Sequence, residues 1–177
     1  MIKDYLFNYR PLLQHMNKAY LLLGSNIGDR LSNLKKAKQL LKKQVGEVIE
    51  CSSIYETASW GKTAQPDFLN QVLLIETKLT AAQIMEQILF IENEMGRVRT
   101  EKNASRIIDI DILFFNEEII ETKNVIIPHP QIQNRNFVLY PLDELAPQLK
   151  HPVLKKTIHE LLLECKDILP VNFYKLQ

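Results

Sequence analysis

The sequence predicts an α+β fold in which an antiparallel sheet carries helices on one face and is followed by C-terminal additions. Strand-like and helix-like segments alternate along the 177 residues, and no linker, repeat or low-complexity stretch interrupts them. Their order is β-α-β-β-α-β, which is the order of the ferredoxin-like fold. A chain of this length can bury about 70% of the surface that it exposes when unfolded, so a single domain is expected.

The first strand and the first helix are predicted from an apolar run and from residues that bound a helix. Residues 19–23 are almost entirely apolar, as in a buried strand. Asp29 is a suitable N-cap for the following helix, because its carboxylate can accept hydrogen bonds from the first turn. Gly46 marks the end of this helix. The apolar face of the helix consists of Leu31, Leu34, Leu41 and Val45.

Two more strands and a second helix form the middle of the chain. Strands are expected at residues 48–55 and 72–77, which are rich in β-branched and apolar side chains. Residues 56–71 between them contain many loop formers and are expected to be a long functional loop. The second helix starts at Thr80, where Gln83 completes a capping box. Its apolar face consists of Ile84, Ile88, Ile91 and Met95, with Gly96 after its end.

The last strand of the core is expected at residues 109–115, which combine two aspartates with an apolar run. A further strand-like segment then extends to Ile127, irregular chain follows, and a short helix is expected at residues 157–164. Residues 1–16 are expected to be an extension, either disordered or an artefact of the start site, because a second methionine directly precedes the first strand. Residues 17–177 then form the domain.

Composition argues against several classes of protein. The net charge is +1, with 24% charged residues, so a global basic field typical of nucleic-acid-binding proteins is missing. No apolar run approaches the ~18–20 residues of a membrane span, and the first residues lack the apolar core of a signal peptide. Cys51 and Cys165 have no metal-ligand spacing, as expected for reduced thiols in the cytoplasm. We expect a cytoplasmic monomer that binds neither nucleic acid nor membrane.

The most informative feature is the pair Asp109 and Asp111 inside an apolar strand. Residues two apart point to the same face of a strand, which sets these Cα atoms roughly 6–7 Å apart. Ionised carboxylates among apolar side chains are unfavourable unless they are paired or bind a metal ion. Carboxylates together with substrate phosphates are the usual ligands of Mg²⁺. The pair indicates a magnesium site; the alternative is two aspartates on an exposed sheet face.

Arginine is concentrated just before this strand. Of the six arginines in the chain, three lie between residues 97 and 106: Arg97, Arg99 and Arg106. The planar guanidinium can bind phosphate through two parallel hydrogen bonds, which the lysine ammonium cannot do. A solvated loop could also carry three arginines by chance. Together with the two carboxylates, the arginines favour a site for phosphoryl transfer.

Six ordered motifs extend from the first strand to residue 137. They are Leu23-Gly24-Ser25-Asn26, Ser53-Ile54-Tyr55-Glu56-Thr57, Gln65-Pro66-Asp67-Phe68-Leu69-Asn70, Gly96-Arg97-Val98-Arg99, Arg106-x-x-Asp109-x-Asp111, and Pro128-His129-Pro130 with Asn134-Arg135-Asn136-Phe137. Their order and spacing resemble those of the 6-hydroxymethyl-7,8-dihydropterin pyrophosphokinase family of folate biosynthesis. The resemblance covers residues 19–169. It is more specific than any single motif.

The resemblance implies an enzyme that transfers pyrophosphate from MgATP to the hydroxymethyl group of 6-hydroxymethyl-7,8-dihydropterin. The products would be the pterin diphosphate and AMP, with ATP as co-substrate and two Mg²⁺ ions as cofactors. One alternative is another Mg²⁺-dependent nucleotidyl or phosphoryl transferase that uses the same pair of aspartates. A second is a ferredoxin-like ligand-binding module without catalytic activity.

The resemblance also implies roles for individual residues. Catalytic roles fall to Arg97, Arg106, Asp109 and Asp111, of which the two aspartates hold the metal ions. The residues expected to contact the nucleotide are Glu92, Arg99, Ile112, His129 and Arg135. The residues expected to contact the pterin are Thr57, Trp60, Gly61, Phe68, Asn70 and Phe137. Apart from the resemblance, Phe68 and Phe137 would be interpreted as core residues, and His129 as a turn residue.

Overall fold

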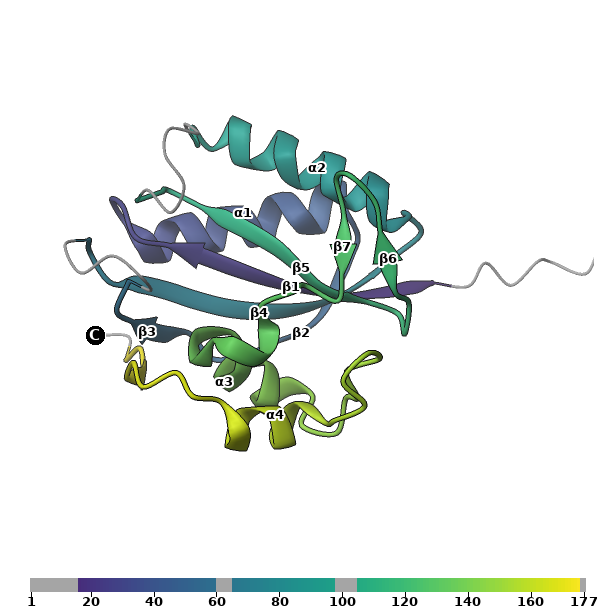
Figure 1. Ribbon diagram of the computed structural model, residues 1–177. Helices are drawn as coiled ribbons and strands as arrows, with labels where there is room; N and C mark the ends of the chain where they lie inside the picture. Colours follow the sequence, from purple (N-terminus) through teal and green to yellow (C-terminus); the bar gives the residue numbers. More distant parts are fainter. Residues whose placement is uncertain (1–15, 60–64, 98–104, 176–177) are drawn as a thin grey trace, which may run out of the picture.

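An antiparallel sheet forms the centre of the protein, and helices cover both of its faces (Figure 1). The computed structural model describes residues 16–59, 65–97 and 105–175. Within these residues the sheet has six strands in the order β5-β1-β4-β3-β8, and β2 also pairs with β4. The strands are β1 (Asn17–Ser25), β2 (Glu47–Cys51), β3 (Tyr55–Thr57), β4 (Phe68–Thr77), β5 (Asp109–Phe115) and β8 (Val171–Phe173). The helices are α1 (Arg30–Gln44), α2 (Ala81–Glu94), α3 (Asn136–Leu145) and α4 (Ile158–Glu164), with a 3-10 turn, η1, at Ile132–Asn134.

The predicted β-α-β-β-α-β core is confirmed, with β1 between β4 and β5. Asp29 caps α1 by accepting a hydrogen bond from the backbone of Ser32. Thr80 and Gln83 form the predicted capping box of α2. Gly46 ends α1 for a different reason than expected, because its φ is not positive. A Cβ atom there would lie only 2.2 Å from the carbonyl oxygen of Glu76, so only glycine allows this approach.

The predicted loop at residues 56–71 is wrong at both ends. The predicted strand 48–55 is split into β2 and β3, and β4 already begins at Phe68. The reason is that two amides in the supposed loop are buried and paired: Asn70 donates to Thr57, and Gln71 donates to the carbonyl of Ser52. These long-range hydrogen bonds satisfy side chains that would otherwise favour a loop.

The chain after β5 differs from the prediction in three places. The expected strand up to residue 127 is a small hairpin of β6 (Ile120–Glu121) and β7 (Ile126–Ile127), separate from the main sheet. The segment expected to be irregular contains α3, although Pro141 lies inside this helix. Burial of Val138, Leu139 and Leu142 against the sheet stabilises α3 in spite of this proline. The third difference is β8, which was not predicted, whereas the short helix near residue 157 is confirmed as α4.

Side chains alternate between the two faces of the sheet. On β1, Leu21 and Leu23 pack against the core under α1 and α2, while Leu22 points to the core under α3 and α4. On β5, Ile110 and Ile112 likewise belong to the first core. The two helices of the predicted core thus share one face, as expected, and the C-terminal additions cover part of the other (Figure 1). In the described part of the chain, none of the helices is long and apolar enough to cross a membrane.

Candidate active site

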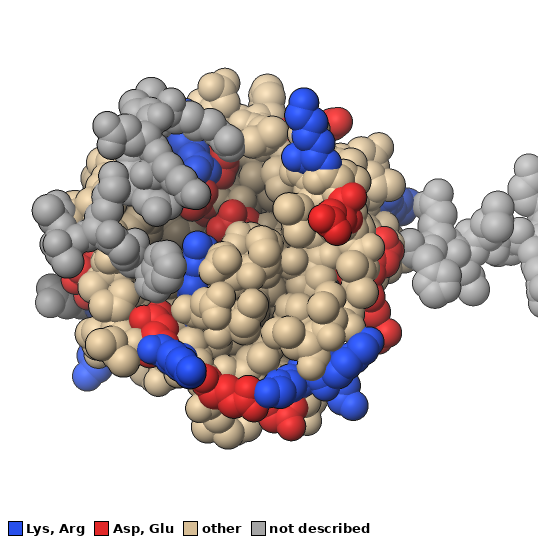
Figure 2. All heavy atoms as spheres, in the orientation of Figure 1, with Lys and Arg blue, Asp and Glu red and all other residues tan. Residues whose placement is uncertain are grey.

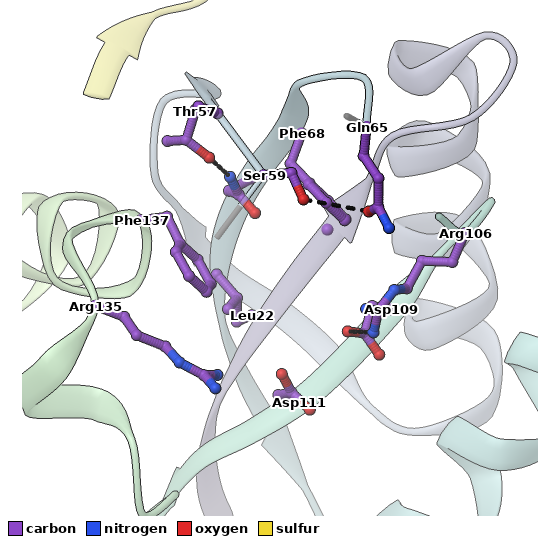
Figure 3. Close-up of a pocket in the computed structure, with 13 residues that line it drawn as sticks. Leu22, Thr57, Ser59, Gln65, Phe68, Arg106, Asp109, Asp111, Arg135 and Phe137 are labelled. Carbon is purple, nitrogen blue, oxygen red and sulfur yellow. Dashed lines mark hydrogen bonds and ion pairs between the residues drawn. The ribbon is translucent and has the colours of Figure 1, made fainter. Parts of the chain in front are cut away.

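A pocket opens on the sheet face that carries α3, at the N-terminal end of this helix. Its volume of about 90 Å³ is several times the ~10–15 Å³ that one water molecule needs in the same measure. In Figure 2 acidic and basic side chains meet at a hollow in the face shown. The pocket is lined by Leu22 and Gly24 of β1, Thr57, Ala58 and Ser59 at β3, Gln65, Phe68 and Asn70 at β4, Arg106, Asp109 and Asp111 at β5, and Arg135 and Phe137 before and in α3 (Figure 3).

The pocket exists because four strands present polar or small residues to this face where α3 does not cover it. Asp109 and Asp111 share the face, since the isoleucine between them points to the opposite core. Gly24 lies beside them on β1. A Cβ atom at Gly24 would lie 3.3 Å from Oδ1 of Asn70 and 3.6 Å from Cδ1 of Phe68, so a side chain there would crowd both residues.

Two arginines bind the carboxylate of Asp109. Nη1 of Arg97 lies 2.6 Å from Oδ1, and Nη1 of Arg106 lies 2.6 Å from Oδ2. Gly96, with a φ of +84°, turns the chain after α2 and leads directly to Arg97. Each carboxylate oxygen of Asp109 is therefore paired with one guanidinium group.

Glu92 holds Arg97 in place beside Asp109. Its side chain is buried, accepts a hydrogen bond of 2.9 Å from the backbone N–H of Ile110, and pairs with Arg97. The backbone bond anchors Glu92 to the strand segment between the two aspartates. A single buried carboxylate thus connects the end of α2, Arg97 and β5.

Asp111 differs from its neighbour. Burial, together with the charge of Asp109, raises the pKa of Asp111 to about 7, and the opposing effects of Arg135 and Arg97 are smaller. In Figure 3 the guanidinium of Arg135 extends toward this carboxylate. A carboxylate with a raised pKa is one whose charge is poorly neutralised, so the position favours a bound cation.

Another part of the pocket lining, the aromatic wall, is formed by side chains that carry no charge of their own. Phe68 and Phe137 both line it, and Asn70 donates a 2.8 Å hydrogen bond to the hydroxyl of Thr57. This bond fixes the amide, so that its oxygen remains available in the pocket. Each ring has an arginine over its face: the guanidinium carbons of Arg106 and Arg135 lie 5.8 Å and 5.6 Å from the centroids of Phe68 and Phe137.

His129 lies outside the pocket lining, close to Arg135. Its Nδ1 accepts a hydrogen bond of 3.2 Å from the backbone of Gln131. Burial, and then the charge of Arg135, lowers the pKa of His129 to about 4. The imidazole is therefore neutral at pH 7, with its proton on Nε2.

The structure brings together most of the residues predicted to form the site. Eight of them line the pocket: Thr57, Phe68, Asn70, Arg106, Asp109, Asp111, Arg135 and Phe137. Glu92 and Arg97 join this group through Asp109 and its strand. Ile112 is only 3% exposed and belongs to the core, so its side chain is not open to a nucleotide. Trp60, Gly61 and Arg99 lie outside the described residues.

Sequence reasoning missed several pocket residues. Leu22 and Gly24 could have been found from the two-residue period of β1, which gives them the same face as Asp109 across the strand pair. Ser59 donates a hydrogen bond to Gln65 across the base of the loop, and only the folded chain reveals that contact. Arg30 and Asn26 were likewise not expected to reach the loop before β4.

Several known proteins have sequences related to that of this chain. Residues 20–147 match the model of the family described as 7,8-dihydro-6-hydroxymethylpterin-pyrophosphokinase. The 2-amino-4-hydroxy-6-hydroxymethyldihydropteridine pyrophosphokinase of Aquifex aeolicus is 41% identical over 145 residues, which cover 82% of this chain and 90% of that protein. The Bacillus subtilis protein of the same name is 45% identical over 135 residues, covering 76% and 81% of the two chains.

A solved structure supports the fold. Wild-type HPPK-DHPS of Plasmodium falciparum superposes with a TM-score of 0.67 at 22% identity. The match covers 84% of this chain and 43% of that chain, so the present chain spans less than half of the solved protein.

Proposed function

The chain belongs to the 7,8-dihydro-6-hydroxymethylpterin-pyrophosphokinase family, and from this membership we propose how its pocket carries out the reaction. The protein is an enzyme of folate biosynthesis that transfers pyrophosphate from ATP to the hydroxymethyl group of 6-hydroxymethyl-7,8-dihydropterin. The products are the pterin diphosphate and AMP. One observation carries the assignment of residues: a pair of carboxylates and a pair of phenylalanines line the same pocket.

We assign the aromatic wall to the pterin. Phe68 and Phe137 can flank a flat ring, and stacking of this kind orients a heterocycle in its site. Asn70, held by Thr57, offers an amide to the polar edge of the ring. Trp60 and Gly61 complete this assignment on the strength of the family resemblance.

We assign Asp109 and Asp111 to two Mg²⁺ ions. Carboxylate oxygens suit this hard cation, and the raised pKa of Asp111 supports a cation at that position. Among the described residues, no group of three or more His, Cys, Asp or Glu side chains could hold a metal ion. Phosphate oxygens and water would therefore supply the other ligands, as is usual for magnesium. When bound, the ions would neutralise charge on the reacting phosphates.

The nucleotide lies, in this proposal, between the carboxylates and the arginines. Arg97, Arg99 and Arg106 bind the triphosphate through paired hydrogen bonds. Arg135 contributes charge beside Asp111, and the Nε2–H of neutral His129 can donate to a phosphate oxygen. Ile112 contributes backbone groups only. Glu92 positions Arg97 and β5 and does not line the pocket.

The reaction needs placement more than covalent chemistry by the protein. The hydroxymethyl oxygen of the pterin forms a bond to the β-phosphorus of ATP. The bond from this phosphorus to the oxygen that bridges to the α-phosphate breaks, AMP leaves, and the hydroxyl proton is released. For this attack the two reacting atoms must lie about 3–3.5 Å apart, which is the placement we assign to the pocket.

Phosphorus NMR of a mixture of ATP, Mg²⁺ and 6-hydroxymethyl-7,8-dihydropterin tests this proposal. We expect AMP and a pterin diphosphate in equal amounts, with very slow turnover of ATP when the pterin is omitted. Formation of ADP and a pterin monophosphate would indicate attack on the γ-phosphorus and contradict the proposal. Release of phosphate that does not depend on pterin would indicate a hydrolase.

We further propose that the enzyme acts as a monomer in the cytoplasm. The two cysteines, Cys51 and Cys165, are free in the structure, which agrees with a reducing compartment. Size-exclusion chromatography with light scattering measures the mass directly, and a value of about twice 20.6 kDa would contradict the monomer.

A further inference from the structure

Arg30, the first residue of α1, lies outside the pocket and contacts both sides of the loop that leaves β3 and returns to β4. Its Nη1 donates a hydrogen bond of 2.7 Å to the backbone carbonyl of Asp67. Its Nη2 lies 2.8 Å from Oε1 of Glu56. One guanidinium therefore bridges two chain segments that approach from opposite directions.

These two contacts lie at the stem of the loop. Thr57 and Phe68 are the last paired residues of the β3–β4 ladder, and Glu56 and Asp67 directly precede them. Thr57 and Phe68 also line the pocket. Arg30 is therefore attached next to two residues that we assign to pterin binding, although it does not line the pocket itself.

The position of Arg30 is unfavourable for the helix alone. A positive side chain in the first turn of a helix is repelled by the positive end of the helix dipole, and the N-cap carboxylate of Asp29 is already used by the backbone of Ser32. The tertiary contacts must offset this repulsion. A guanidinium suits the task because its planar fork can donate to two acceptors at once, which an ammonium on a flexible stem does less well.

We propose that Arg30 is a positioning residue for the pterin. By joining Glu56 to the carbonyl of Asp67, it fixes the separation and direction of the two strand ends from which Thr57 and Phe68 enter the pocket. The inference rests on the proposed function, since it concerns the same pocket. It assigns no contact between Arg30 and either substrate.

The solvent exposure of the ion pair between Arg30 and Glu56 indicates which property of the protein it affects. The side chains of Arg30 and Glu56 are 26% and 34% exposed. Ion pairs that are partly open to water contribute little to the stability of a protein. The effect of Arg30 should therefore appear in the geometry of the pterin pocket more than in the stability of the whole fold.

The test compares Arg30→Met with Lys42→Met. Lys42 is also on α1 and also forms an ion pair with a strand, at 2.7 Å from Glu47, but this strand lies away from the pocket. The measurements are the dissociation constants of 6-hydroxymethyl-7,8-dihydropterin and of a non-hydrolysable ATP analogue, the KM for each substrate, kcat, and the melting temperature.

We expect Arg30→Met to weaken pterin binding by about 3- to 10-fold, the scale of the net contribution of one ordinary hydrogen bond or one partly exposed ion pair. Nucleotide affinity and melting temperature should match those of Lys42→Met. Arg30→Lys keeps the charge but can reach only one acceptor well, so it should lie between the wild type and Arg30→Met.

Pterin affinity of Arg30→Met equal to that of Lys42→Met would overturn the inference. Equal losses for pterin and nucleotide, together with a lower melting temperature, would also overturn it, because they indicate a general packing defect. Failure of the wild-type enzyme to bind the pterin at all would instead contradict the proposed function, on which the inference depends.

Discussion

At the scale of single residues, the two carboxylates of the pocket have different surroundings: Asp109 pairs with two guanidinium groups, whereas burial and the charge of Asp109 raise the pKa of Asp111. Asp109 and Asp111 face one pocket, as their spacing predicted. The sequence did not predict this difference, because the ion pairs of Arg97 and Arg106 with Asp109 form only when the chain is folded. The contacts of Arg30 with Asp67 were equally hidden, since they join residues 37 positions apart.

The raised pKa of Asp111 predicts a stability that depends on pH. The carboxyl is neutral in both states below pH 4, but between pH 4 and about 7 the folded protein binds a proton that the unfolded chain has lost. Stability of the ligand-free protein therefore falls as pH rises through this window. Asp111→Asn removes the effect, which is on the order of 4 kcal/mol. We expect the variant to melt several degrees higher than the wild type at pH 8.

Melting curves at pH 4 and pH 8 check this prediction, with Asp143→Asn as a control for loss of a carboxylate outside the pocket. The difference between Asp111→Asn and the wild type should nearly vanish at pH 4. Turnover should fall by roughly 100-fold or more, because a metal ligand is lost. Full activity of Asp111→Asn, or a lower melting temperature at pH 8, would contradict the assignment.

Phe137 provides a test of the aromatic wall. Phe137→Ala should weaken pterin binding by about 1–3 kcal/mol, the scale of base–aromatic stacking, and leave nucleotide affinity almost unchanged. Isothermal titration with each ligand separates the two effects. Equal losses for both ligands would show that Phe137 is mainly a packing residue of the core under α3, which it also contacts.

At the scale of elements, the sequence predicted best the segments whose signals are local. The capping box of α2 and its four buried apolar residues were correct, because both depend on neighbours within one helix. The start of β4 was missed because Asn70 and Gln71 are polar, and only partners from other strands make them acceptable in a sheet. α3 was also missed: its N-cap residue, Arg135, forms no capping hydrogen bond with its side chain, and Pro141 lies inside the helix.

In the turn after α1, adding one methyl group at Gly46 should lower the stability of the protein. Gly46→Ala would place a Cβ atom 2.2 Å from the carbonyl oxygen of Glu76 and 2.9 Å from Cβ of Thr77. The connection from α1 to β2 would have to move away from β4, at a cost of about 1–3 kcal/mol. Urea denaturation should detect this loss, whereas Lys43→Ala, on the exposed side of the last turn of α1, should have little effect. Wild-type stability of Gly46→Ala would show that the turn can shift freely.

At the scale of the whole molecule, the two faces of the sheet have different roles: one forms the apolar core, and the other carries the pocket. The face under α1 and α2 is a continuous apolar core, whereas the opposite face is only partly covered by α3 and α4. The pocket occupies the uncovered part, where β1, β3, β4 and β5 each contribute residues. The alternation of strands and helices in the sequence predicted that α1 and α2 cover the first face. In the C-terminal layer that limits the pocket, α4 was predicted, whereas α3 was not expected although its sequence is amphipathic.

The same arrangement predicts that residues 1–15 are dispensable. β1 begins at Asn17 and pairs along its length with β4, and residues from Ala19 onward also pair with β5. A chain that starts at Met16 should therefore keep the melting temperature and the turnover of the full chain. Calorimetry and a coupled assay compare the two proteins. A loss of several degrees on truncation would show that the first residues pack against the domain.

The two guanidiniums on Asp109 have a consequence for how metal and nucleotide bind. In the ligand-free protein Arg97 and Arg106 occupy the oxygens that we assign to magnesium, so a free metal ion must compete with them. Phosphates of ATP offer the same arginines an alternative anion. Binding of the metal should therefore be linked to binding of the nucleotide, with each raising the affinity for the other by the same factor.

Mn²⁺ binding followed by electron paramagnetic resonance, with and without a non-hydrolysable ATP analogue, measures this linkage. Arg97→Gln should bind Mn²⁺ more tightly than the wild type when nucleotide is absent and should show a smaller gain when the analogue is added; equal Mn²⁺ affinities in the two proteins would contradict the competition. Such a protein would bind free divalent ions weakly in the absence of substrate and bind them tightly only together with the triphosphate. Its own arginines would then exclude metal ions that arrive without the nucleotide.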